Sequence, residues 1–155
     1  MKTQGSGSLR LLAALVLASG SAWAADGVTI VNPAELKWAD VGSLPPGAKI
    51  ALIEGQMSDA GPITVRLKLP ANYRIPPHWH PGVERVTVLS GTFHYGMGDS
   101  VDTAKTMPLG PGALVIMPPN MNHYVVTKEE TVVQLNVIGP WGITYLNPMD
   151  DPRKK

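Results

Sequence analysis

The stretch PPHWHPGVE, residues 76–84, places two histidines and a glutamate close together in the chain. Side chains two positions apart on an extended strand point to the same face, with their backbones about 6.6 Å apart, so His78 and His80 can reach one ion. The insert Pro81-Gly82-Val83 favours a turn that can bring Glu84 back to the same point. His123 lies far along the chain, at the start of another apolar segment. These four residues predict a metal site of three imidazoles and one carboxylate.

The composition limits which metal such a site would hold. The 155-residue chain has no cysteine, so thiolate ligands and disulfides are excluded. Imidazole and carboxylate ligands suit one divalent transition metal, Mn, Fe, Ni, Cu or Zn, and the ligand types do not choose among them. Four protein ligands leave one or two positions open on a five- or six-coordinate ion, as an activating metal requires. The alternative interpretation is a metal-free barrel in which these residues are only surface or core polar groups.

Outside this stretch, the sequence alternates short apolar runs with turn residues. Fifteen prolines and sixteen glycines disfavour long helices. Runs rich in Val, Ile, Leu, Thr and aromatic residues, bounded by Gly, Pro or Asn, are typical of a β-sandwich or barrel. The predicted strands are 49–54, 63–69, 84–89, 92–95, 113–117, 123–126 and 131–138. The segment 32–41 is left open between one helical turn and an edge strand.

Two motifs resemble those of the cupin superfamily. The first, G-x5-H-x-H-x3-E-x6-G, is matched by His78, His80, Glu84 and Gly91, with Asn72 in place of the leading glycine. Asparagine also tolerates a left-handed backbone.

The second motif, G-x5-P-x-G-x2-H-x3-N, is matched by Gly112, Pro118 and His123. Asn120 replaces its inner glycine and Thr127 replaces its last asparagine. The resemblance covers roughly residues 45–140 and is closest to small single-domain bacterial cupins and ChrR-like cupin modules.

The resemblance implies an all-β fold, the cupin double-stranded β-helix or jelly-roll barrel, and a homodimer. For an enzyme it implies metal-dependent chemistry of the oxygenase, decarboxylase or isomerase type on a small molecule. The alternatives are a non-enzymatic module that binds or senses a small molecule or metal, and a metal-free oligomeric scaffold. The sequence does not choose a reaction.

Several other residues are candidates for lining a small-molecule pocket. Gln134 and Asn136 alternate with apolar residues, so this polar pair would either line the pocket or face solvent. Tyr124, Met117 and Met121 flank the second motif and would close the barrel mouth or fill the core. We expect Arg85 to point away from the metal. We expect His94 to be a surface or hydrogen-bonded histidine and not a ligand, and the sequence does not decide which face of its strand it occupies. We expect Trp141 to pack on the barrel exterior or at a dimer contact.

The chain begins with a predicted signal peptide at residues 1–24. Lys2 and Arg10 precede or flank an apolar run at residues 11–18 that is too short to span a bilayer, and Ala22-Trp23-Ala24 fits a signal-peptidase site. We therefore expect a periplasmic or secreted protein that has no membrane contact after cleavage. Removal of this leader changes the net charge from +1 to −1, and no basic cluster suits nucleic acid.

The remaining chain divides into three predicted parts. An N-terminal segment at 25–44 leads into the cupin domain at 45–147. A charged C-terminal tail follows at 148–155, and we expect its basic end, residues 153–155, to be solvated.

Overall fold

A computed structural model describes residues 27–155 of the chain. The predicted signal peptide lies outside the described residues. Within 27–155, no helix is both long and apolar enough to cross a membrane.

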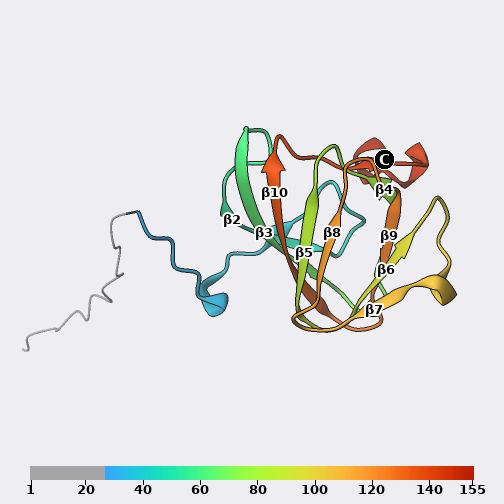
Figure 1. The fold of residues 1–155 in the computed structure, drawn as a ribbon, viewed down its shortest axis with the longest axis horizontal. Coiled ribbons are helices and arrows are strands. Elements are labelled where there is room, and N and C mark those ends of the chain that lie inside the picture. The colour runs from blue at the N-terminus through green and yellow to red at the C-terminus, as the bar shows by residue number, and fades with distance from the viewer. Residues whose placement is uncertain (1–26) are drawn as a thin grey trace, which may run out of the picture. The chain divides into compact units, whose positions relative to one another are not determined.

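The described chain folds into two antiparallel β-sheets (Figure 1). The six-stranded sheet has the order β1 (Ala39–Asp40), β2 (Lys49–Glu54), β3 (Gly61–Leu69), β10 (Thr131–Gly139), β5 (Glu84–Ser90) and β8 (Leu114–Met117). The five-stranded sheet has the order β11 (Thr144–Tyr145), β4 (Arg74–Trp79), β9 (His123–Val126), β6 (Phe93–Met97) and β7 (Met107–Leu109). Short 3-10 helices occupy Pro33–Glu35, Thr103–Lys105, Pro148–Asp150 and Pro152–Lys154. The predicted all-β jelly roll is confirmed.

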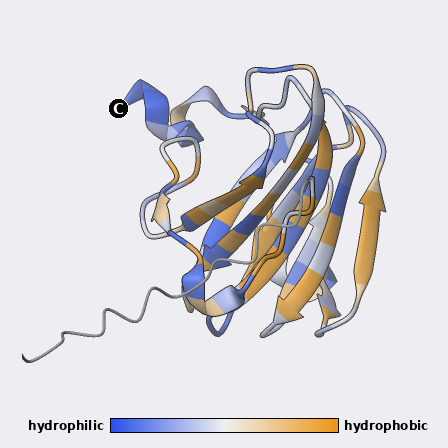
Figure 2. Ribbon diagram, turned by 90° about the vertical axis from the view of Figure 1, so that its left-hand side faces the viewer, coloured by the Kyte–Doolittle hydropathy of each residue, from blue (hydrophilic) through white to orange (hydrophobic). Residues whose placement is uncertain are grey.

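Alternation along the strands builds the core between the two sheets. Val133, Leu135 and Val137 of β10 are buried, whereas the residues between them are half-buried on the other face. Buried residues of both sheets, such as Val65 and Ile75, belong to one apolar cluster. The alternation is visible as blue and orange bands along the strands in Figure 2. The fold therefore buries one face of each sheet, as period-two patterning requires.

The seven predicted strands all occur, and the residues around His78 form β4 as the metal argument assumed. The additional strands β1, β7 and β11 have only two or three residues, too few for a sequence pattern. The segment left open at 32–41 contains both alternatives, a 3-10 turn at Pro33–Glu35 and the edge strand β1.

Two asparagines replace motif glycines at positions where the backbone is left-handed. Asn72 has φ 57° and Asn120 has φ 60°, and they are the only non-glycine residues with positive φ among those described. Asparagine adopts this conformation more readily than most other residues. Both departures from the motif therefore preserve the turn that the glycine supplies.

The chain segments on either side of the barrel are joined to it more closely than their predicted boundaries suggest. Leu44 of the N-terminal segment is buried in the core. In the C-terminal segment Asp151 is buried, and Arg153 donates to both of its carboxylate oxygens and to the Ile143 carbonyl. Arg153, Lys154 and Lys155 are exposed, as expected, although the ion pair with Asp151 holds Arg153 against the fold.

Candidate metal centre

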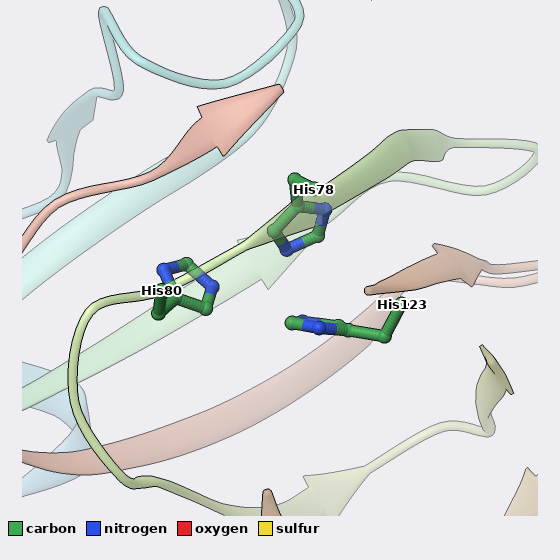
Figure 3. A group of neighbouring side chains, drawn as sticks. All are labelled: His78, His80 and His123. Atoms are coloured by element: carbon green, nitrogen blue, oxygen red, sulfur yellow. The ribbon is translucent and has the colours of Figure 1, made fainter. Parts of the chain in front are cut away.

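Strand pairing brings the candidate ligands together from distant parts of the chain. His78 of β4 is paired directly with His123, the first residue of β9. His80 follows two positions after His78 and lies on the same side, so the three imidazoles converge (Figure 3). Glu84 opens β5, in the opposite sheet. The centre thus joins both sheets across the interior.

The three imidazoles are close enough to share one ion. One ring nitrogen of each of His78, His80 and His123 lies within 4.8 Å of the others. One carboxylate oxygen of Glu84, Oε2, lies 3.5 Å from Nε2 of His80 and 3.5 Å from Nε2 of His123. All four residues are buried, at 3–7% exposure. The predicted set of four ligands is therefore brought together at one point.

Backbone carbonyls fix the orientation of all three rings. The Nδ1 atoms of His78, His80 and His123 lie 2.7, 2.7 and 2.9 Å from the carbonyl oxygens of Pro76, Gly142 and Met121. Because a carbonyl oxygen only accepts, Nδ1 must carry the ring proton, which leaves Nε2 as a lone-pair donor. Such second contacts commonly orient metal-binding histidines.

Burial favours the form of the imidazoles that binds metal. The pKa of His78 lies well below its ordinary value, first because the ring is buried and then because His123 and His80 are close. Burial also lowers the pKa of His80, against the opposing effect of the Glu84 carboxylate. Both rings are therefore neutral at neutral pH, and neutral imidazole is the ligand.

The donor set fits a divalent transition metal. Three Nε2 lone pairs and a carboxylate oxygen converge in a buried space, an arrangement that a cation stabilises. The set lacks sulfur and is too rich in nitrogen for calcium or magnesium, which take oxygen ligands.

A cavity of about 320 Å³ opens beside this centre. His78, His80 and Glu84 contribute to its wall, and most of the rest is apolar. The apolar lining consists of Val41, Leu44, Ile50, Met57, Val65, Leu67, Ile75, Leu135, Trp141 and Ile143. Ser43, Gly142 and Arg153 complete the lining. The site therefore combines a polar end with an apolar chamber.

Trp141 lies in this cavity, which corrects its expected place on the exterior. Its indole stacks on the His80 ring, with centroids 4.6 Å apart and planes 19° apart. Its backbone N–H donates to the Met57 carbonyl at 2.7 Å. The sequence signal was the Gly139-Pro140-Trp141 turn, but only the fold shows that Trp141 packs against His80 of the candidate centre.

The polar pair predicted as a possible pocket lining faces outward instead. The Gln134 side chain accepts from Arg66 Nε at 3.1 Å, and Asn136 donates to Thr64 Oγ1 at 3.0 Å. Both lie on the face of β10 opposite the buried Leu135. Alternation separates the two faces of this strand, and the apolar face is the one that lines the cavity.

The other three pocket candidates also lie outside the cavity lining. Tyr124 is buried, and its hydroxyl bridges the backbone N–H and carbonyl of Asp102. Met117 is a core residue. The Met121 sulfur accepts from the Tyr95 hydroxyl at 3.5 Å, and the Met121 carbonyl orients His123.

Arg85 points away from the candidate centre as expected, and His94 is not one of the three histidines that gather there. Arg85 is exposed beside the buried Glu84. His94 is half-buried between the buried Phe93 and Tyr95, and therefore lies on the opposite face of β6.

Comparisons with known proteins agree with this fold. Residues 26–141 match the model of the ChrR cupin-like domain. A comparison with curated proteins found no match.

Solved structures with the same fold come from proteins of different kinds. The polyketide cyclase RemF from Streptomyces resistomycificus is 19% identical, with a TM-score of 0.63, over 82% of this chain and 91% of that one. The DMSP lyase DddQ from Ruegeria pomeroyi is 20% identical, with a TM-score of 0.59, over 74% of this chain and 63% of that one. A chain of the Rhodobacter sphaeroides complex of SigE with the anti-sigma ChrR is 20% identical, with a TM-score of 0.52, over 68% of this chain and 51% of that one.

These likenesses show a shared fold and do not by themselves indicate a common activity. The match to the domain model, by contrast, covers most of the chain. The chain belongs to the ChrR cupin-like domain family of cupins.

Proposed function

We propose that this protein binds one divalent transition metal through His78, His80, Glu84 and His123, and uses it to convert a small molecule held in the adjoining cavity. The observation that carries the proposal is the shared orientation of the three imidazoles. Each has its Nδ1 proton held by a backbone carbonyl, which leaves Nε2 free on all three rings, and Nε2 of His80 and of His123 each lies 3.5 Å from Glu84 Oε2. Chemistry of the oxygenase, decarboxylase or isomerase type fits such a centre.

When bound, the ion would supply Lewis-acid or redox chemistry. The residues of the chain supply the rest. The three backbone carbonyls hold the rings in register, and the apolar cavity wall excludes water from the polar end. RemF and DddQ, which share the fold, are named as a cyclase and a lyase, so this fold is compatible with conversion of a small molecule.

Metal analysis of variants tests the centre. The protein is produced without a histidine tag, and its metal content is measured by mass spectrometry. We expect about one ion per chain in the native protein, and a loss of affinity of at least about 10- to 100-fold in His80→Ala and Glu84→Ala. His94→Ala is the matched control, since the fourth histidine lies on the other face of β6. Equal metal content in His80→Ala and His94→Ala would refute the centre.

Turnover is tested separately from binding. Product formation that survives removal of all metal would contradict metal-dependent chemistry. Metal-dependent ligand binding without conversion of any bound compound would favour the alternative, a binding or sensing module.

We further propose that the protein is exported and forms a homodimer. The Lys2 to Ala24 leader pattern supports export, and N-terminal sequencing of the exported protein should begin at Ala25. The outer strand β8 carries exposed Leu114 and Ile116, which supports a subunit contact there. In analytical ultracentrifugation, we expect the native protein to sediment as a dimer and Ile116→Asp to sediment as a monomer.

A further inference from the structure

We propose that the cavity selects a ligand with an apolar, ring-sized body and a single anionic oxygen donor, such as an aromatic carboxylate or an enolate. The anionic oxygen of the ligand is inferred from the proposed metal centre, so that part rests on the proposed function. The apolar body of the ligand is inferred from the wall of the cavity alone.

The wall offers an apolar body many contacts and a polar body few partners. Ten of the sixteen lining residues are apolar, and they come from both sheets, from the N-terminal segment and from loops. Val65, Leu67 and Ile75 are buried core residues, so this part of the wall is continuous with the core. A sugar or polyol placed here would lose its hydrogen bonds to water without replacing them, which weakens its binding.

The polar groups of the cavity are concentrated at one end. His78, His80 and Glu84 lie together, and the Trp141 ring stacks on His80 at their edge. Three neutral imidazoles and one carboxylate around a divalent ion leave one net positive charge. A ligand with one anionic oxygen neutralises this charge, whereas a second carboxylate would lie against the apolar wall.

The cation in the cavity lining does not provide a second anchor for an anion. Arg153 is the only lysine or arginine that lines the cavity formed by residues 27–155. Its guanidinium is paired with both oxygens of Asp151, at 2.7 and 2.8 Å, and also donates to the Ile143 carbonyl at 3.0 Å. The charge of Arg153 is thus already neutralised within the protein.

The volume sets the size of the body. An engineered apolar cavity of about 150 Å³ holds one benzene ring. The present cavity of about 320 Å³ is roughly twice as large. A body of two fused rings therefore fits, with the oxygen donor at the histidine end.

Calorimetric titration of the full chain with three probes tests the proposal. The probes are 2-naphthoate, which has both features, 2-naphthalenemethanol, which lacks the charge, and gluconate, which has the charge on a polar body. In the metal-loaded protein we expect 2-naphthoate to bind at least about 10-fold more tightly than either of the others. In metal-free protein the advantage of 2-naphthoate over 2-naphthalenemethanol should disappear, while both still bind more tightly than gluconate.

Two pairs of variants locate the binding. Ile50→Asn places a polar group in the cavity wall, and Ile138→Asn places the same group at an exposed position of β10. Met57→Gln and Met149→Gln form a second pair, in the cavity and at an exposed site. We expect each cavity variant to weaken 2-naphthoate about 10-fold and each control to leave it unchanged. Thermal melting confirms that each variant is folded, and the loop position of Met57 makes its variant the less disruptive.

The outcomes separate this proposal from the metal centre. Two results would overturn the claim that the cavity selects an apolar ligand body. One is that gluconate binds as tightly as 2-naphthoate, and the other is that both cavity variants leave the affinity for 2-naphthoate unchanged. A different result would be a protein that binds no metal, but binds 2-naphthalenemethanol and loses this binding in Ile50→Asn. That result would overturn the proposed function and the anchoring of an anionic oxygen at the metal, and it would support the selection of an apolar ligand body.

Discussion

Trp141 should strengthen metal binding without touching the ion. Its indole stacks on the His80 ring, with ring centroids 4.6 Å apart and planes 19° apart. Stacked aromatic pairs contribute about 0.5–1.5 kcal/mol beyond the area that they bury. Since about 1.4 kcal/mol corresponds to a tenfold change in affinity, Trp141→Ala should weaken metal binding about two- to tenfold. Trp141→Phe should recover much of the loss.

Competition with a chelator of known affinity measures this effect. Trp79→Ala is the matched control, because Trp79 lies between His78 and His80 in sequence and its side chain points to the opposite face of the strand. Trp79→Ala should leave metal affinity within about twofold of the native value. The stacking argument would be refuted if Trp141→Ala and Trp79→Ala had equal affinities, or if Trp141→Phe were as weak as Trp141→Ala.

Three further predictions concern acid sensitivity and close packing. Burial lowers the pKa of both His78 and His80 below 6.5, so at acid pH the unfolded chain binds more protons than the folded chain. The free energy of unfolding of the metal-free protein should therefore fall as the pH drops below about 6.5, by up to about 1.4 kcal/mol per histidine per pH unit, and the melting temperature should fall with it; a flat pH–melting profile would contradict this. A Cβ at Gly96 would lie 2.2 Å from Tyr124 Cζ, so Gly96→Ala should cost about 1–3 kcal/mol in denaturant unfolding, and an unchanged midpoint would count against this packing. At Asn120, with φ 60°, replacement by Ala should cost about 1–2 kcal/mol while replacement by Gly costs little, and equal stabilities of the two variants would argue against the left-handed turn.

The sequence predicted which side chains would gather, because most of the motif is local. His78, His80 and Glu84 lie within one short stretch, and period-two geometry fixes their common face. His123 was placed by its motif, and the pairing of β4 with β9 brings it opposite His78. The strands were predictable for the same reason, since burial of one sheet face requires alternation.

The cavity could not be predicted because its wall is assembled from distant segments. Leu44, Met57 and Ile143 meet there through tertiary packing, and none carries a distinctive local pattern. Alternation showed that Gln134 and Asn136 share a face, but not which face is inside. Their partners Arg66 and Thr64 on β3 provide the polar environment outside.

The carbonyl contacts of the histidines were equally hidden. Two of the three are made within two residues of the histidine, by Pro76 and Met121, but strand patterns do not reveal backbone oxygens that bend toward a side chain. The third comes from Gly142, which is 62 positions from His80. Trp141 was misplaced for the same reason, because its contact with His80 depends on the path of the chain after β10.

The central claim is that four side chains from both sheets bind one ion. Anomalous diffraction from crystals of the natively loaded protein tests it most directly. The account predicts a single strong peak about 2.0–2.2 Å from Nε2 of His78, His80 and His123 and from a Glu84 oxygen. A peak elsewhere in the protein, or a loaded crystal in which one of these four residues turns away from the ion, would contradict it.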